Sequence, residues 1–182
     1  MNRLLASLLL KGLRWVPQAG LLTSALKKVR LFFPDRDQYL DFLQDYATRD
    51  HWFSRFFAAF EIHVPYTVQP EAVLNLLKDL SSDKNDMVLE AAAKSWSHVM
   101  SEDPEKIMEI LEKLSNSDSY RVRRTAALAP VLFFDRGDYD NSLKRRIISF
   151  WKSFENDPKQ GLQNLVRTQI LKKRGLIESN DS

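Results

Sequence analysis

Basic side chains crowd the last third of the sequence, and their chemistry suits an anionic ligand. Three arginines stand close together in "SDSYRVRRTAALAP" (117–130), at the start of a predicted helix. Lysine and arginine neutralise phosphates and contact them without reading a base sequence. The pattern therefore predicts a nucleic-acid or anion site with the following candidate residues: Arg121, Arg124, Arg136, Lys144, Arg145, Arg146 and Lys152.

The sequence contains no pattern typical of a catalytic or metal site. His51, His63 and His98 are never three or four residues apart, so they cannot form a metal-binding pair on one helix. The five glycines are scattered, and there is no G-x-S-x-G, no phosphate-binding glycine loop and no cysteine. We therefore predict no catalytic residue, no metal and no cofactor. The lack of cysteine suits a reducing compartment.

Charge is distributed unevenly along the chain. Residues 1–34 carry six basic side chains and no acidic one, residues 35–120 carry 8 basic and 17 acidic, and residues 121–182 carry 13 basic and 7 acidic. An anionic partner should therefore favour the two ends of the chain, and a basic partner should favour the middle.

A repeat organises the elements that must position these charges. Segment 70–96 matches segment 104–130 without a gap. In both, Pro and Glu begin a first helix with apolar residues at relative positions 0, 3, 4 and 7. A polar stretch then precedes a second, alanine-containing helix. Residues 37–60 share the pattern, and residues 142–169 follow it after a longer interval, with the extra residues in a loop predicted at 133–141.

Segments 70–96 and 104–130 are offset by 34 residues. Helix pairs that recur at such an interval are typical of an α-solenoid. The core motif D-x-x-x-V-R-x-x-A-A resembles HEAT repeats, and here it is made of Asp118, Val122, Arg123, Ala126 and Ala127. The resemblance covers about residues 36–170. It implies an all-α fold, an α-solenoid of about four HEAT-like helical hairpins with an N-terminal helical cap.

Aspartate and arginine of successive HEAT repeats commonly form a ladder inside the stack. The resemblance therefore implies that Asp118, Arg123 and Arg55 are structural ladder residues. The second repeat departs from the pattern, because Leu89 stands where the arginine would be, and the first has Ser54 in the valine position.

Residues 1–34 form a basic, amphipathic segment. Arg3, Ser7 and Lys11 lie on one side of a predicted helix, with leucines on the other, and "LLASLLL" is too short to span a bilayer. We predict that residues 1–34 cap the repeat domain of residues 35–173, with a flexible tail at 174–182. Two alternatives stay open: membrane-surface contact through residues 1–16, and a targeting segment.

A second resemblance concerns "RDHWFSRFF" (49–57) and "SDSYRVRR" (117–124). Their aromatic–x–x–Arg spacing is similar to that in HEAT-like DNA-alkylation-repair proteins. The likeness implies DNA binding on a basic concave surface and, for an enzyme, DNA N-glycosylase activity. The complete Trp–Asp–Arg set of those enzymes has no match in this sequence. Repeat packing instead predicts a place in the core for Trp52, Trp96 and Trp151.

The sequence favours a non-catalytic interaction module, a scaffold whose hairpins bind another protein. One alternative is a DNA-binding protein of the alkylation-repair type that uses the basic cluster. Another is a membrane-peripheral scaffold held by the N-terminal helix. The predicted location is the cytoplasm, with an organelle or a membrane surface as alternatives.

Overall fold

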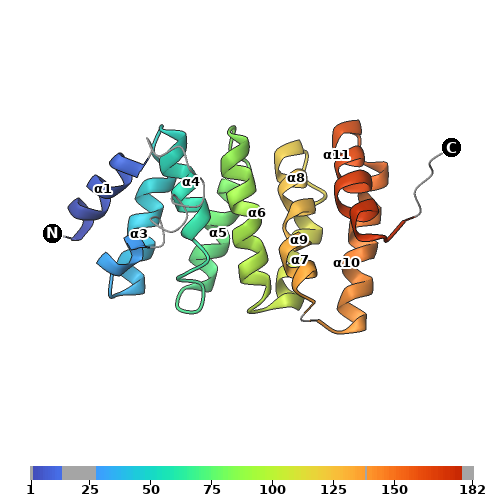
Figure 1. Cartoon of the computed structure of the whole chain (residues 1–182), viewed down its shortest axis with the longest axis horizontal. Helices are drawn as coiled ribbons and strands as arrows, with labels where there is room; N and C mark the ends of the chain where they lie inside the picture. The colour runs from blue at the N-terminus through green and yellow to red at the C-terminus, as the bar shows by residue number, and fades with distance from the viewer. Residues whose placement is uncertain (1, 14–27, 138, 178–182) are drawn as a thin grey trace. The chain divides into compact units, whose positions relative to one another are not determined.

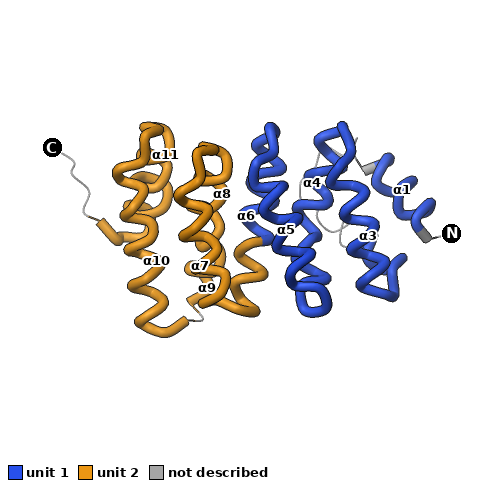
Figure 2. Tube along the Cα trace, turned by 180° about the vertical axis from the view of Figure 1, so that it is seen from behind, with its two compact units in different colours: residues 1–95 blue, residues 96–182 orange. Residues whose placement is uncertain are grey.

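The computed structural model describes residues 2–13, 28–137 and 139–177, and the regular structure in these ranges is helical throughout (Figure 1). The chain divides into two compact units, residues 1–95 and 96–182, and the division falls within α6 (Asp86–Met100) (Figure 2). The prediction of an all-α helical-repeat fold is confirmed. The predicted boundaries of the repeat domain, at residues 34 and 173, stay a prediction.

Unit 1 begins with α1 (Asn2–Leu13) and the short η1 (Arg30–Phe32). They are followed by α3 (Arg36–Ala47), α4 (Trp52–Glu61), α5 (Pro70–Leu80) and the first part of α6. Helices α3 and α4 pack against each other, and α5 packs against both. Aromatic rings fill the space between them, with neighbouring ring centroids 4.4 to 6.2 Å apart: Phe33, Tyr39, Phe42, Tyr46 and Phe57.

A buried polar group ties η1 to the first hairpin. Glu61, at the end of α4, is inaccessible to solvent and accepts a 3.0 Å hydrogen bond from the Tyr39 hydroxyl. The Arg30 side chain lies 3.6 Å from the same carboxylate. Burial and the neighbouring carboxylate raise the pKa of Tyr39, so this phenol stays protonated and keeps donating.

The helices begin where the sequence provides caps. Asp35 accepts a hydrogen bond from the Asp37 N–H at the start of α3, and His51 accepts one from the Phe53 N–H at the start of α4. Pro70 is the first residue of α5, where its missing N–H would have had no partner in the helix. These caps agree with the repeat boundaries expected from the sequence.

Unit 2 contains α7 (Pro104–Leu114), α8 (Tyr120–Leu128), α9 (Pro130–Arg136) and α10 (Asn141–Ser153). Four short elements follow: η2 (Phe154–Asn156), α11 (Gln160–Asn164), the π-helical η3 (Leu165–Leu171) and η4 (Lys172–Arg174). Helix α7 packs against α8 and α10, and α10 packs against η3.

The second helix of the third repeat is interrupted, which the repeat pattern did not predict. Pro130 lacks an N–H, and α8 gives way to α9 at this residue. The Ser97 hydroxyl donates to the Ala129 carbonyl and accepts from the Phe133 N–H at 3.2 Å. It thus stands between two groups that would otherwise bond to each other in a helix. Helix α9 also fills part of the loop predicted at 133–141 and ends at Gly137, whose φ is 80°.

The N-terminal helix docks on unit 1 through part of its surface. Ala6 and Leu10 are buried, and Arg3 forms a 3.4 Å ion pair with Asp41 of α3. Residues 14–27, which belong to the predicted N-terminal cap, lie outside the described residues. Within the described ranges, every helix is too short or too polar to cross a bilayer.

The predicted tail begins with an anchored residue. Arg174 donates hydrogen bonds of 2.6 and 2.7 Å to the Asp135 carboxylate of unit 2. Gly175 follows with a φ of 65°, a left-handed conformation that glycine adopts easily. Residues 178–182 lie outside the described part of the chain.

Candidate nucleic-acid interface

An arginine–aspartate pair links consecutive repeats inside unit 2. Arg123 lies near the start of α8, and its Nε and Nη2 donate to the Asp157 carboxylate at 2.6 and 3.1 Å. Its Nη1 donates to the Ser117 and Asp118 carbonyls. The side chains of Arg123 and Asp157 are only 9% and 4% exposed. All three guanidinium nitrogens of Arg123 donate within unit 2, so this side chain holds two consecutive repeats together.

The pair lowers the pKa of its carboxylate. Burial acts to raise the pKa of Asp157. Hydrogen bonds from Arg123 and the Lys159 N–H, together with the guanidinium charge, outweigh burial and hold that pKa below its usual range.

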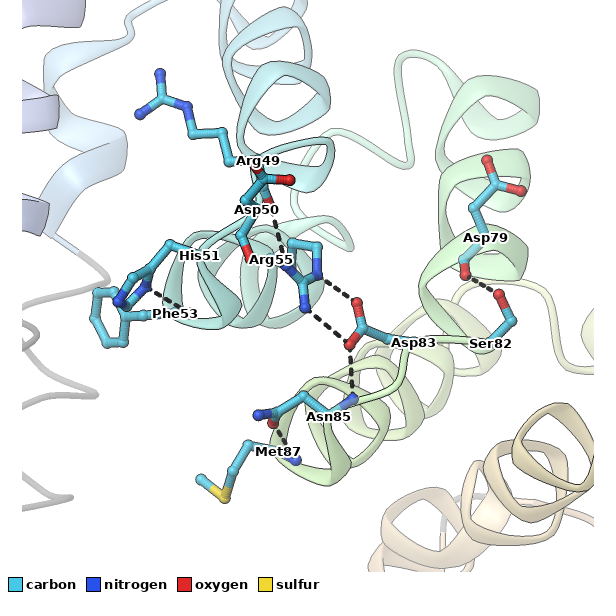
Figure 3. Close-up of polar contacts among 10 residues, drawn as sticks. All are labelled: Arg49, Asp50, His51, Phe53, Arg55, Asp79, Ser82, Asp83, Asn85 and Met87. Carbon is cyan, nitrogen blue, oxygen red and sulfur yellow. Dashed lines mark hydrogen bonds and ion pairs between the residues drawn. The ribbon is translucent and has the colours of Figure 1, made fainter.

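An equivalent pair stands in unit 1, where Arg55 of α4 points at Asp83 (Figure 3). The Arg55 Nε and Nη2 donate at 2.5 and 3.3 Å, and its Nη1 donates to the Arg49 and Asp50 carbonyls. Burial tends to raise the pKa of Asp83, but the bonds from Arg55 and the Asn85 N–H hold it below its usual range.

The ladder role predicted for the Asp118 side chain is wrong, whereas the structural role predicted for Arg55 and Arg123 agrees with these pairs. The carboxylate that pairs with Arg123 belongs to Asp157, one repeat later, whereas Asp118 contributes its main-chain carbonyl. In the sequence repeat, Asp83 and Asp157 are equivalent to position 117, which is Ser. Position 89, equivalent to Arg55, is Leu. The sequence signal for the pairs is therefore an Arg followed by an Asp one repeat later.

Two of the candidate phosphate ligands are engaged by neighbouring side chains. Arg146 donates to both oxygens of Glu112 at 2.8 Å and to Glu105 at 2.5 Å. The hydrogen bonds from Arg146 lower the pKa of Glu112. Arg136 lies 2.9 Å from the Ser101 hydroxyl and 3.2 Å from the His98 Nδ1. An added phosphate would have to compete with these groups.

The other candidates occupy three places in unit 2. Arg121 is exposed and Arg124 is half-buried on the first turns of α8. Lys144 and Arg145 border a shallow hollow of about 430 Å³ on α10. Lys152, near the end of α10, lines a separate groove of about 630 Å³.

The groove at Lys152 contains functional groups that the sequence analysis missed. Arg167 of η3 supplies a second cation, and the other lining residues are Glu155, Gln160, Gln163, Asn164, Leu176 and Ile177. We call it the amide groove. The signal was present, because positions 160, 163, 164 and 167 have the spacing of one helix face.

The amide groove adjoins the start of α8. A Cβ placed on Gly161 would lie 3.9 Å from the Tyr120 hydroxyl oxygen, so the side chain of the first residue of α8 reaches α11. The helix that carries Arg121 and Arg124 therefore begins beside the one that lines the groove with Gln160.

Two solved structures share this arrangement of helices. AlkD2 from Streptococcus mutans superposes with a TM-score of 0.74 at 16% identity, covering 100% of this chain and 92% of that one. The smu.31 structure from Streptococcus mutans UA159 gives 0.73 and 15%, with the same coverage. The protein has an AlkD-like helical-repeat fold. No family model and no curated protein matches the sequence.

The tryptophans take unequal positions in this AlkD-like fold. Trp96 and Trp151 are fully buried, as repeat packing predicts, and the Trp151 Nε1 donates to the Ala127 carbonyl at 2.8 Å. The core prediction for Trp52 is wrong, because 40% of this residue is exposed. Trp52 is the first residue of α4, and Phe53 and Phe57 supply the buried rings of that helix instead.

Chemically, the described part of the AlkD-like fold offers groups that bind anions. Among the described residues, no group of three His, Cys, Asp or Glu side chains is placed to hold a metal ion. The amide groove presents two cations and three side-chain amides. The Gln163 Nε2 donates to the Asp157 carbonyl at 2.6 Å and the Gln160 Nε2 to the Asn164 Oδ1 at 3.1 Å, so each of these two amides keeps one further N–H for an anion or a polar base edge.

Proposed function

We propose that the protein binds DNA through unit 2, using the amide groove and the neighbouring arginines of α8. The observation that carries this proposal is the convergence of Lys152, Arg167 and three amide side chains in one groove. Two likenesses support it: the fold is shared with AlkD2, and the sequence resembles the HEAT-like alkylation-repair proteins. Both favour DNA binding over the protein-scaffold interpretation.

The groove suits the backbone of DNA. Each cation that neutralises a phosphate releases condensed counterions, which provides affinity without regard to sequence. The Asn164 side-chain amide, and the N–H of Gln163 that its bond to the Asp157 carbonyl leaves over, can donate to phosphate oxygens and fix the orientation of the duplex. Glu155 also lines the groove and opposes an anion, so binding should depend on Lys152 and Arg167 acting together.

We propose binding and not base excision. Trp96 and Trp151 are enclosed in the core, so neither can stack on a base without unfolding of its surroundings, and the 40% exposed Trp52 belongs to unit 1 and not to the proposed interface in unit 2. Arg123, part of the motif that resembles the repair proteins, is held by Asp157.

The test is a charge reversal in the groove, Lys152→Glu with Arg167→Glu. Affinity for a labelled duplex of about 20 base pairs should fall at least about tenfold, and the slope of log affinity against log salt should decrease by about 2. Fluorescence anisotropy at several salt concentrations measures both. The matched control is Lys78→Glu with Lys84→Glu, two exposed lysines of unit 1. An equal loss in the control, or wild-type affinity that ignores salt, would overturn the proposal.

A second comparison locates the interface further. Arg121 is exposed on α8, whose first residue, Tyr120, reaches α11, whereas Arg145 borders the separate hollow on α10. Arg121→Glu should therefore weaken DNA binding more than Arg145→Glu does. The reverse order would place the DNA on α10.

A further inference from the structure

Helix α1 presents leucines to solvent while it is docked on unit 1. Leu4, Leu5 and Leu8 are 66%, 44% and 55% exposed, whereas Ala6 and Leu10 are at most 2% exposed. At about 100° per residue, the three exposed leucines share one arc of the helix, and the two buried residues lie on the opposite side. The outward side of α1 is therefore an apolar surface that unit 1 leaves uncovered.

The next described element, η1, also exposes a leucine. Leu31 of η1 is 78% exposed, and η1 packs against α1. Exposed leucines are common singly, but several on two packed elements mark a contact surface.

The charges that residues 1–34 themselves contribute are all basic. Lys11 and Lys28 are exposed, and residues 1–34 contain no acidic side chain. Arg3 is 59% exposed at its side chain while it pairs with Asp41. A short helix with leucines on one side and basic residues at its edges is typical of helices that lie in the headgroup region of anionic membranes.

We propose that α1 docks the protein on an anionic lipid surface, with Leu4, Leu5 and Leu8 among the acyl chains and the basic residues at the headgroups. The helix enters the interface without leaving unit 1, since the leucines already face outward. This inference does not depend on DNA binding, because unit 2 carries the residues proposed for DNA.

A second copy of the chain fits this surface less well. A stable protein interface buries about 800 Å² on each partner, and a 12-residue helix with three exposed leucines offers much less. Two such helices would also bring like charges together. A lipid surface avoids both difficulties, because it supplies negative charge and a continuous apolar layer.

The experiment is co-sedimentation of the full chain with vesicles of phosphatidylcholine, with and without about one-third phosphatidylglycerol. The wild type should bind the anionic vesicles and lose binding at high salt. Leu4→Ser with Leu8→Ser should lower the vesicle partition coefficient at least about tenfold, because less apolar surface leaves water. The control is Val68→Ser with Leu132→Ser, which changes exposed aliphatic side chains elsewhere and should keep the wild-type partition.

Other readouts separate the alternatives. Both double variants should keep the wild-type circular dichroism spectrum and DNA affinity. The proposal is overturned if the wild type ignores anionic vesicles, or if the two double variants bind them equally. It is also overturned if Leu4→Ser with Leu8→Ser converts a dimer to a monomer in light scattering, since a second copy would then cover the leucines.

Discussion

Units 1 and 2 contain the same kind of buried arginine–aspartate pair but expose different surfaces. In both, a largely buried arginine bridges to an aspartate of the following repeat and to two main-chain carbonyls before its own helix. On the outside, unit 1 exposes Trp52 and the leucines of α1, whereas unit 2 exposes cations and the amide groove.

The difference separates what builds the repeat from what can contact a partner. Arg55 and Arg123, which the repeat motif marks as structural residues, donate to partners within the fold. Lys152 and Arg167 are exposed and line a groove. The number of arginines therefore indicates less about ligand binding than the identity of the arginines that pair with other residues inside the repeats.

The largest expected effect contrasts a tryptophan from each unit. Trp151→Ala should lower the free energy of unfolding by about 3 to 5 kcal/mol, because it opens a cavity in the core. Trp52→Ala should lower it by less than about 1.5 kcal/mol, since that ring is partly in solvent. Urea denaturation followed by circular dichroism measures both. Equal losses would mean that the two rings have similar surroundings in solution.

The arginine–aspartate pairs should come next. Arg123→Leu leaves Asp157 as a buried charge without its main partner, and a loss of about 3 to 5 kcal/mol is expected. Arg55→Leu should cost no more, because its pair is slightly more exposed. The double variant Arg123→Leu with Asp157→Leu should be more stable than Arg123→Leu alone. If the double variant is less stable, the unpaired Asp157 carboxylate does not cause the stability loss of Arg123→Leu.

Acid should weaken both pairs. Asp83 and Asp157 have folded-state pKa values below their usual range, so the unfolded chain binds these protons more readily. Their stabilisation is complete above the unfolded value near about pH 4 and is lost as pH falls through the lower folded values. Asp157→Asn should therefore flatten the decline of unfolding free energy below about pH 4, as measured by urea titrations. An unchanged decline would contradict the assignment.

The smallest effect is expected at Arg146. Its side chain is 31% exposed, and its partners Glu112 and Glu105 are 41% and 66% exposed. Solvent screens such pairs, so Arg146→Gln should cost no more than about 1 kcal/mol in urea denaturation. It should also weaken DNA binding less than Lys152→Gln does, because Glu112 and Glu105 compete for its charge. A larger effect on DNA would show that the pair opens for a ligand.

Several helix positions were predictable from spacing alone. The gapless match of segments 70–96 and 104–130, the prolines that begin both and the apolar stripes predict α5 and α7 at their observed starts. The break at Pro130 was harder to foresee, because a proline can also begin a helix, as it does for α9. Its accommodation depends on Ser97, a residue of the preceding repeat.

The candidate site was only partly predictable, for a physical reason. Composition places cations in the last third of the chain, but their availability depends on partners in other repeats. Arg146 is engaged by Glu112, and Arg174 by Asp135, each about one repeat away in the sequence. Lys152 and Arg167 line the same groove because α10 packs against η3.

By itself, the sequence determined the helical repeat, because periodic burial and caps act within a few neighbouring residues. Only the tertiary structure decided which charges face solvent, which leucines of α1 stay outside and which aspartate meets each arginine. Those choices depend on contacts between residues about one repeat apart, and local sequence patterns do not encode them.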